Sequence, residues 1–445
     1  MHEGPGVGSA STMTAILERR AARFSDSTRP LEQLVHVEDP AFYINPWPTY
    51  ARLQQEAPVY FYEALNTWII TKYDDVRHVA RSPEVFSARH GILLLDGVKH
   101  GAGAADLFAG GTDFIGLTDP PRHTELRRVM QAPFSPPALA ALEPKIAEFS
   151  DRLLDHLNAE EPVEWVSAVA ARLPVMVIAS ILGIDHEDED FLDRARRWSD
   201  VVEDVASKDL TPTEMIDARE AFAHLDEFIA DMFAQKRRRP GDDFLSFLLK
   251  ERLDGEMLSE TNLIGFTQIL LAAGSDTVRA LLSQLVVQLA SHSDQRDLLA
   301  ADPTLGGDVV EETLRFAPPA RGFARQVVAP TVLRGQILHP GQRVLMCFDA
   351  ANRDPDAFED PHVFDITRPR SRRNVAFGFG THMCVAAPLA RLEGRVLLAR
   401  LLQRFPSFEL ACPGDRVESF LRNGFHAVNL HLCPVDGAPQ RRRGL

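Results

Sequence analysis

The chain has 445 residues, of which 45% are hydrophobic and 25% charged, a balance typical of globular proteins that excludes disorder along the whole length. Its 63 acidic and 48 basic residues give a net charge of -15, which disfavours binding to nucleic acid or to an anionic membrane surface. None of the four cysteines falls in a C-x-x-C pair, which argues against a zinc ribbon or a dithiol redox site. So few cysteines indicate a reducing compartment, and we expect a cytoplasmic protein.

The first part of the chain lacks the charged-then-apolar pattern of a signal peptide. We expect residues 1–35 to be a flexible tail and residues 36–445 to form one folded unit. Residues 88–117 are rich in glycine and have little periodicity, which is typical of a functional loop. Short apolar runs predict strands at Val59–Tyr62, Trp68–Thr71, Thr331–Leu333 and Arg343–Met346.

Helical patterns dominate the rest of the sequence. The longest apolar run, residues 173–184, is too short to span a bilayer and indicates a buried helix. A long helix is predicted to begin after Ser259, a suitable N-cap, and to pass through the core because both of its faces are rich in apolar residues. Pro318 and Pro319 end a second helix, and a third is predicted from about Ala387 to Phe405.

The string FGFGTHMC, residues 377–384, places a lone cysteine, Cys384, shortly before the third helix. Glycines allow unusual backbone angles and let the chain approach a flat ligand closely. Free amide hydrogens at the start of a helix favour a thiolate. On these features alone, Cys384 could be a small core residue, a nucleophile or a metal ligand.

The full pattern F-G-x-G-x-H-x-C strongly resembles the haem-binding loop of the cytochrome P-450 family. The resemblance implies that Cys384 is the axial thiolate on the iron of haem b, and that His382 reaches a haem propionate. Ala386 departs from the pattern, because the family commonly has glycine two residues after the cysteine. The extra methyl group is expected to be tolerated and to tighten the approach to the porphyrin.

A second string, AAGSDT at residues 272–277, lies inside the long helix. Glycine and an acid–alcohol pair are unfavourable there, and a hydroxyl that bonds to the preceding turn can open a helix. The string matches the oxygen-activation motif of the family. The resemblance implies that Asp276 and Thr277 are the catalytic proton-relay pair.

A third string is EETLR, in which Glu312 and Arg315 are three residues apart and can pair on one helix face. Most such pairs are solvated and contribute little to stability. The resemblance implies instead a buried structural pair that ties this helix to the segments ANRDP and FDITR before the cysteine loop.

A fourth string is DPPRHTELRR, in which His123 and Arg127 are four residues apart on one helix face. Both side chains could reach one anionic group, or the helix could simply be basic and exposed. The family match assigns both residues, together with Arg325, to the haem propionates.

The resemblance covers residues 36–435, with the motifs in the order of the family. It implies a mainly α fold with small β-sheets, a triangular helical prism in which haem b lies between the long central helix and the helix after the cysteine loop. It implies a haem-thiolate monooxygenase that inserts one atom of O2 into a C–H bond, by hydroxylation, epoxidation or oxidative dealkylation.

No flavin or nicotinamide domain fits into this length, so we expect electrons from a separate ferredoxin and its reductase. Four arginines lie around the cysteine loop in the sequence and could form a basic docking patch for an acidic partner. They could equally be scattered, solvated side chains. They are Arg372, Arg373, Arg391 and Arg395. We expect the protein to be a monomer.

The segments that face the haem in the family provide an expected substrate pocket. Its side chains are mainly apolar, which favours a compact apolar or aromatic substrate. They are Ile92, Leu93, Leu94, Ile269, Leu270, Ala273, Ala320, Phe323 and Phe425. Arg89, Arg321 and His426 could anchor a carboxylate or carbonyl group, although a surface or haem-side position is more common for such residues.

Three other functions fit parts of the sequence. A peroxide-driven haem peroxygenase shares the fold, but such family members carry Arg–Pro in place of Asp276 and Thr277. A non-catalytic haem gas sensor or carrier needs no proton relay and usually needs an output domain. A thiol hydrolase without haem would need a His–Asp set, which the sequence does not independently support.

Overall fold

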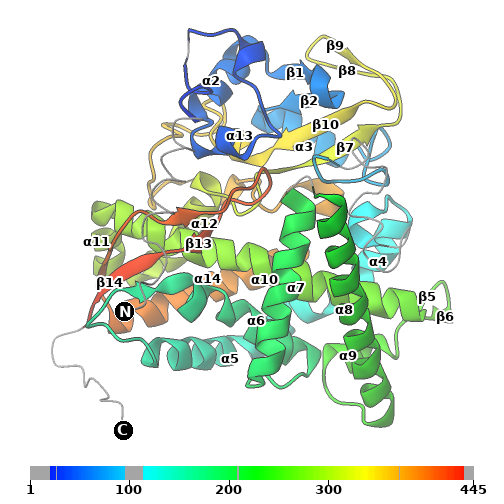
Figure 1. Ribbon diagram of the computed structural model, residues 1–445, viewed down its shortest axis with the longest axis vertical. Helices are drawn as coiled ribbons and strands as arrows, with labels where there is room; N and C mark the ends of the chain where they lie inside the picture. Colours follow the sequence, from blue (N-terminus) through cyan, green and yellow to red (C-terminus); the bar gives the residue numbers. More distant parts are fainter. Residues whose placement is uncertain (1–20, 27, 96–113, 208–209, 370, 435–445) are drawn as a thin grey trace, which may run out of the picture.

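The computed structural model describes residues 21–26, 28–95, 114–207, 210–369 and 371–434. The side chains of Ala272 and Ala273 are outside this description. A mixed β-sheet with short helices occupies one end of the molecule, and long helices form the larger remaining part (Figure 1). The mainly helical fold with small sheets confirms the architecture expected from the sequence.

The helices follow one another along most of the chain. Their bounds are α2 Trp47–Glu56, α3 Tyr73–Arg81, α4 Arg122–Met130, α5 Pro136–Asp155, α6 Arg172–Leu182, α7 Glu189–Ser207, α8 Pro212–Arg238, α9 Phe244–Leu248, α10 Glu260–Ser291, α11 Ser293–Ala301, α12 Gly306–Phe316, α13 Phe348–Ala351 and α14 Ala387–Arg404. The three helices that we predicted at the centre and end of the chain correspond to α10, α12 and α14.

The largest sheet has five strands in the order β1-β2-β10-β7-β3. Strands β2 and β10 are parallel, and the other neighbours are antiparallel. Their bounds are β1 Val59–Tyr62, β2 Thr67–Ile70, β3 Phe86–Ser87, β7 Gly322–Val327 and β10 Arg343–Cys347. The predicted strands are therefore all present, with shifts of no more than one residue at their ends.

The smaller sheets lie outside this one. Three strands pair in the order β11-β14-β4, and three hairpins are formed by β5 with β6, β8 with β9, and β12 with β13. Their bounds are β4 Val163–Glu164, β5 Arg252–Leu253, β6 Glu256–Met257, β8 Thr331–Leu333, β9 Gln336–Leu338, β11 Ser407–Leu410, β12 Asp415–Arg416, β13 Phe425–Ala427 and β14 Asn429–Cys433.

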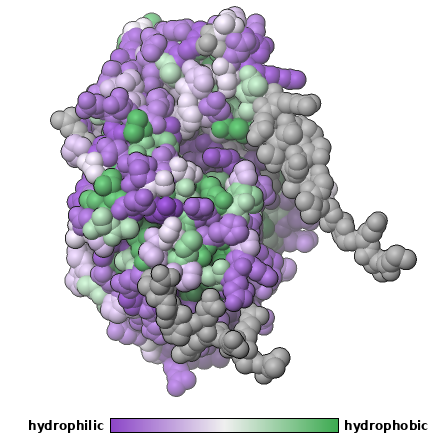
Figure 2. All heavy atoms as spheres, turned by 90° about the vertical axis from the view of Figure 1, so that its left-hand side faces the viewer, coloured by the Kyte–Doolittle hydropathy of each residue, from purple (hydrophilic) through white to green (hydrophobic). Residues whose placement is uncertain are grey.

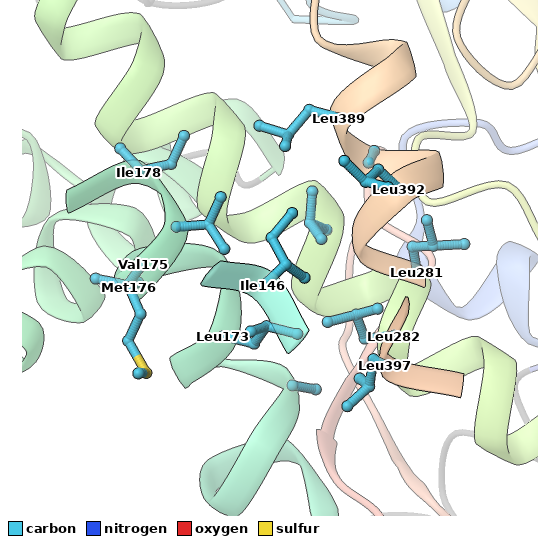
Figure 3. Packing of buried hydrophobic residues seen from close by; sticks show 14 of the residues in the cluster. Ile146, Leu173, Val175, Met176, Ile178, Leu281, Leu282, Leu389, Leu392 and Leu397 are labelled. Carbon is cyan, nitrogen blue, oxygen red and sulfur yellow. The ribbon is translucent and has the colours of Figure 1, made fainter. Parts of the chain in front are cut away.

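Helix α10 passes through the main hydrophobic core. Ser259 caps its start by accepting a hydrogen bond from the amide of Asn262, as predicted. Figure 3 shows Leu281 and Leu282 of α10 in the same hydrophobic cluster as Ile146 of α5 and Leu397 of α14. Among the described residues α10 alone is long and apolar enough to cross a bilayer, but 75% of its apolar window is buried, as in the core helix of a globular protein.

The N-terminal segment is more ordered than the sequence indicated. Phe24, Leu31 and Val35 are buried and belong to a second hydrophobic cluster with Phe42 and Tyr50. The expectation of a flexible tail over residues 1–35 therefore does not hold for its last part. The apolar side chains there pack in one cluster with Ile69 of β2 and Leu345 of β10. The earlier part of that expected tail, residues 1–20, lies outside the described residues.

Polar and charged residues cover most of the face shown in Figure 2, with apolar residues scattered among them. Large apolar side chains that are exposed in the described residues include Val332 and Ile337 of the β8–β9 hairpin, at 62% and 60%. Single exposed residues of this kind are common on globular proteins.

Candidate active site

The cysteine loop is held in a tight conformation before α14. The amide of Cys384 donates to the carbonyl oxygen of Phe377 at 2.9 Å. Gly378 and Gly380 have positive φ angles of 71° and 69°, which favour glycine. A Cβ atom at Gly380 would lie 2.4 Å from the carbonyl oxygen of Ala80 at the end of α3, so a side chain does not fit there. Gly380 thus lets the loop pack directly against α3.

The sulfur of Cys384 lies at the start of α14. Burial raises the pKa of the Cys384 thiol and outweighs the opposite effects of hydrogen bonds from the backbone amides of Ala386 and Ala387 and of the charge of Arg127. These groups stabilise a negative sulfur, and the side chain remains partly accessible. Ala386 has φ -87° and ψ 4°, a conformation that needs no glycine, so its methyl group imposes no backbone strain.

Imidazole and guanidinium groups from three elements meet beside this loop. His123 and Arg127 come from α4, His382 from the cysteine loop, and Arg325 from β7. The rings of His123 and His382 have centroids 4.2 Å apart. Arg127 donates to the carbonyl oxygen of Met383 at 2.7 Å. The structure therefore brings together all four residues that the sequence assigned to haem propionates.

Arg127 and Arg325 give this partly desolvated site its positive charge, whereas both histidines are held neutral. Burial lowers the pKa of His123 to about 4, with a further contribution from Arg127. Burial also lowers the pKa of His382 to about 2, and the charge of Arg325 adds to the effect. The pKa of Arg325 itself falls to about 10, mainly through burial. An anionic ligand would pair with the two arginines and favour the protonated form of the histidines.

The unpartnered nitrogen atoms of the two histidines fit a site for haem. His123 Nδ1 and His382 Nε2 are buried and have no hydrogen-bond partner in the described structure. Buried polar atoms are rarely left without partners, so both nitrogens indicate a missing acceptor group. Two propionates would supply such acceptors, and Cys384 would supply the axial sulfur. The donor set therefore fits haem, and the described residues contain no group of three His, Cys, Asp or Glu side chains that could hold a metal ion without it.

The oxygen-activation string lies in the middle of α10. Asp276 is 7% exposed, and its Oδ1 accepts from Arg279 Nη2 at 2.6 Å. Arg422, between β12 and β13, also contacts Asp276 through Nη1. Thr277, next in the chain, is exposed. The helix continues without interruption through the string, so the expected opening is not seen there. The hydroxyl of Ser275 bonds to the carbonyl of Leu271 at 2.9 Å, a bond that a regular helix accommodates.

Two further acids extend this charge network to α7. Asp200 accepts from Arg279 Nη1 at 2.9 Å, and Glu203 lies 3.1 Å from Arg422 Nε. Sequence reasoning missed Arg279 and Arg422. The three-residue spacing of Asp276 and Arg279 in the sequence indicates that the two side chains can pair on one face of a helix. The contact with Arg422 joins distant parts of the chain, and no local pattern predicts it.

Glu312 and Arg315 form a completely buried ion pair on α12. Both side chains have 0% exposure, and two hydrogen bonds of 2.8 and 2.7 Å join them. Arg315 also donates to the carbonyl oxygens of Asn352 and Val363, each at 3.0 Å. Glu312 accepts from the amide of Asp365 at 3.0 Å. The pair thus connects α12 to the two segments that precede the cysteine loop.

The expected pocket residues occupy different parts of the structure. Leu270 and Phe425 are 4% exposed and belong to the main core, and Ile269 packs against it. Phe323 lies 5.9 Å from the ring of Phe348, and the carbonyl of Ile92 accepts from the Ala324 amide at 2.7 Å.

Leu94 packs in the second cluster and lines a cavity of about 10 Å³ with Tyr43 and Arg321. That volume holds one water molecule and no substrate. Leu93 bonds to Arg343 through its carbonyl, and Ala320 forms a β-bridge with Arg422. Ala273 lies outside the described side chains.

The charged residues that the sequence offered as substrate anchors have other contacts. Arg89 lies 3.7 Å from Asp119, and Arg321 is buried 3.7 Å from Asp349. His426 is exposed. Arg321 also lies over the ring of Tyr43, so its charge is directed toward the sheet end of the molecule.

The four arginines around the cysteine loop are mostly paired with acids. Arg391 bonds to Glu311 at 2.6 Å, Arg395 to Glu143 at 2.9 Å, and Arg372 to Asp308 at 3.4 Å. The guanidinium of Arg373 lies 5.7 Å from the ring centroid of Tyr73. These acids reduce the net positive charge of the expected docking patch.

The helical fold and the arrangement of cysteine, histidine and arginine fit a haem-binding type of protein, and comparisons with known proteins show the family. The model of the family described as "Cytochrome P450" matches residues 60–299 and 305–431. The chain is 33% identical to "Cytochrome P450 109" of Bacillus spizizenii, covering 88% of this chain and 91% of that protein. It is 36% identical to "Vitamin D(3) 25-hydroxylase" of Pseudonocardia autotrophica, with 88% and 95% covered.

Solved structures give the same result. The structure of CYP109E1 from Bacillus megaterium in complex with testosterone superimposes with a TM-score of 0.77 at 30% identity, covering 88% of this chain and 99% of that chain. Cytochrome P450 CREJ in complex with (4-ethylphenyl) dihydrogen phosphate gives a TM-score of 0.80 at 28% identity, with 87% and 97% covered. This chain belongs to the cytochrome P-450 family and is a monooxygenase of that family.

Proposed function

We propose that the enzyme inserts one atom of O2 into a C–H bond of a small, largely apolar or aromatic molecule, by hydroxylation, epoxidation or oxidative dealkylation. Electrons would come from a separate ferredoxin and its reductase, with the enzyme acting as a cytoplasmic monomer in a single catalytic domain. One observation carries the proposal: two helix amides face the sulfur of Cys384 beside a cluster of unsatisfied histidine nitrogens and two arginines.

In this proposal each residue of the site has a defined task. Cys384 binds the iron, and its two amide hydrogen bonds moderate the electron density of the sulfur. His123, His382, Arg127 and Arg325 hold the two propionates. Haem b, when bound, supplies the redox-active iron that activates O2. The Glu312–Arg315 pair has a folding role and does not take part in the chemistry.

Asp276 and Thr277 are proposed to move protons during oxygen activation. A carboxylate that passes protons must be held next to the reacting centre and shielded from bulk water. Asp276 is buried in the middle of α10 and fixed by Arg279 and Arg422, which supports this role. The neighbouring Thr277 provides a hydroxyl that both donates and accepts hydrogen bonds.

The carbon monoxide difference spectrum of the reduced protein tests the proposal. We expect a strongly red-shifted Soret band that is lost in Cys384→Ser. The matched control is Cys412→Ser, because Cys412 is a free, exposed cysteine away from the loop. A colourless folded protein, or a band typical of histidine-ligated haem, would overturn the assignment of Cys384.

Measurements of product formation then distinguish a ferredoxin-dependent monooxygenase from a peroxygenase and from a gas sensor or carrier. With a ferredoxin, its reductase and NADH, product should form only when all three components are present. Product formation that is faster with peroxide alone would identify a peroxygenase instead. No product with any candidate substrate and redox partner would favour a haem gas sensor or carrier.

A further inference from the structure

A cavity of about 470 Å³ lies where three helices meet. Its lining comes from the end of α5, from the first half of α6 with the helical turn Val166–Ala170 before it, and from the start of α7. Helix α6 contacts both of the other helices (Figure 1). Sites for small molecules typically have volumes of roughly 300–1,000 Å³. This cavity is therefore large enough for an organic ligand, unlike the cavity beside Arg321.

Helix α6 separates the cavity from the oxygen-activation string. Met176 lines the cavity, and Ile178 lies two residues further along α6, which places the two side chains on opposite faces of the helix. Figure 3 shows these two side chains pointing in different directions. A Cβ atom on Gly274 of the string would lie 3.3 Å from Ile178. Since Ile178 faces α10, Met176 faces away from it, and the cavity is distinct from the haem site.

The floor of the cavity is apolar and comes from all three helices. Leu157 and Ala168 are half-buried, so part of their apolar surface remains accessible in the cavity. Leu153, Met176 and Leu192 are more deeply buried, at 8%, 1% and 7% exposure, and give the floor a firm backing. Covering accessible apolar surface is favourable by roughly 25 cal/mol per Å². The floor therefore favours a ligand with an apolar body.

Two ion pairs connect the helices at the rim of the cavity. Arg152 of α5 bonds to Glu187, and Arg172 of α6 bonds to Glu189 of α7 at 2.5 Å. All four side chains line the cavity. Each arginine thus has its own counter-ion, so a charged ligand would have to break one of these pairs or remain unpaired. The rim therefore favours an uncharged ligand over a carboxylate or an amine.

A histidine at the rim offers one acceptor atom to a ligand. The ring Nδ1 of His156 lies 2.6 Å from the carbonyl oxygen of Arg152. Because a carbonyl oxygen only accepts, Nδ1 carries the hydrogen, and Nε2 of the neutral ring is an acceptor. No described residue donates a hydrogen bond to Nε2. His156 is exposed and lines the cavity, so this nitrogen is available to a hydroxyl group.

We propose that this cavity is a second binding site, separate from the haem site, for an uncharged apolar molecule that carries a hydroxyl group. The apolar body lies over Leu157 and Ala168, and the hydroxyl donates to Nε2 of His156. A hydroxyl is preferred to an ether or a ketone, because Nε2 accepts a hydrogen bond and has none to donate. The inference goes beyond the proposed oxygen chemistry and does not depend on it.

Calorimetry of the haem-loaded protein at about pH 8, where free imidazole is neutral, tests this inference. The probes are 2-naphthylmethanol, its methyl ether and 2-naphthoic acid, which share one ring system and differ in their polar group. The haem spin state reports binding next to the iron, so heat of binding without a parallel spin-state change identifies the second site. There the alcohol should bind about fivefold more tightly than the ether, since one neutral hydrogen bond distinguishes them, and more tightly than the acid.

Variants of two lining residues locate the site. Ala168→Phe fills the cavity and should abolish binding at the second site, while the spin-state titration stays unchanged. Ala141→Phe, at an exposed position about three turns before the cavity on α5, is the matched control. His156→Phe should remove the preference for the alcohol, and His156→Gln should retain part of it because its amide oxygen accepts. His224→Phe changes an exposed histidine of α8 and should have no effect.

Several results would overturn the inference. They are no binding other than that at the haem, second-site binding that survives Ala168→Phe, equal or tighter binding of the ether or the acid, and a preference for the alcohol that survives His156→Phe. None of these results would change the assignment of Cys384. Loss of the thiolate-type carbon monoxide spectrum would instead overturn the proposed function and leave the second site to be judged by calorimetry.

Discussion

Arg422 Nη1 and Asp276 Oδ1 are in direct contact, although the two residues lie on separate elements far apart in the sequence. Their side chains are 5% and 9% exposed. Glu203 on α7 lies on the other side of the guanidinium, so Arg422 bridges two buried carboxylates. One cation thus links the long central helix, the β12–β13 hairpin and α7.

Removing Arg422 should destabilise the protein strongly. Arg422→Met would leave Glu203 and Asp276 with less compensation in a buried environment, and we expect a loss of about 3 kcal/mol in the free energy of unfolding. Urea unfolding measures this change. Arg422→Met combined with Glu203→Gln should recover part of the loss, because the second change removes one uncompensated charge. Additive effects of the two changes would contradict the bridging role, and Arg239→Met is the control for loss of an exposed arginine.

Asp276→Asn should slow product formation by about a hundredfold, since a positioned proton donor contributes 100-fold to 10,000-fold. The amide keeps the size of the side chain but cannot pass a proton in the same way. Initial rates in H2O and D2O provide the measurement, and the solvent isotope effect should increase in the variant. Glu203→Gln, which changes a carboxylate of the same network that is not adjacent to Thr277, is the matched control. An unchanged rate and isotope effect in Asp276→Asn would remove Asp276 from the proton pathway.

The buried pair on α12 should be required for folding. Arg315→Met leaves Glu312 charged with 0% exposure, and we expect a loss of about 3–5 kcal/mol in the free energy of unfolding. Arg315→Lys should also be strongly destabilising, because lysine cannot satisfy Glu312 and the carbonyls of Asn352 and Val363 together. Urea unfolding of the purified variants measures both effects. A loss of less than 1 kcal/mol would contradict this prediction, because it would mean that the pair contributes no more than a solvated surface ion pair.

These features differ in how far the sequence predicts them. The cysteine loop, α10, α12 and α14 were predictable because each depends on local signals: glycines at positive φ, an N-cap, and prolines that end a helix. The pairing of Glu312 with Arg315 was also visible as a spacing on one helix face.

Contacts between distant segments were not predictable in this way. Arg422 reaches Asp276 only after the hairpin packs on α10, and the position of Arg416 beside Phe425 depends on strand register. Residues 24–35 gave no strong local pattern, so their packing against the second cluster was missed. Long-range packing decides each of these cases, and a single sequence does not display it.

Glu393 should make stability depend on pH in an unusual direction. It is 1% exposed on α14, and burial raises the pKa of its carboxyl group to about 8. Its Oε2 has no partner in the described structure. As pH rises above the unfolded value of about 4.5, the unfolded chain loses its proton before the folded protein does. The stability contributed by the protonated carboxyl is therefore complete below about 4.5 and lost as pH rises through about 8.

Glu393→Gln removes this titration, and urea unfolding at several pH values tests it. The free energy of unfolding of the unmodified protein should fall by up to about 1.4 kcal/mol per pH unit more steeply than that of the variant across this window. The exposed Glu418→Gln change provides the control. Parallel pH profiles for the unmodified protein and Glu393→Gln would show that this carboxyl is ionised or solvated in the folded state.

Reversing two arginines near the cysteine loop tests the surface for the electron donor. Arg372 is exposed at 74% and lies 3.4 Å from Asp308, and Arg373 lies beside Tyr73. Because Arg391 and Arg395 already bond to acids, Arg372 and Arg373 carry the more available charge. The change of both to Glu should slow reduction by a ferredoxin severalfold at low salt and leave substrate binding unchanged.

The effect should shrink as salt is raised, because exposed charges are screened over about 8–10 Å at moderate ionic strength. Stopped-flow reduction at several salt concentrations measures it. The matched control reverses Arg238 and Arg239 at the exposed end of α8, which changes the net charge equally at a different surface. Equal slowing by both double variants would indicate a general charge effect. Unchanged rates in the Arg372 and Arg373 variant would exclude these residues from the docking surface, because a local electrostatic contact must respond to a reversal of its charge.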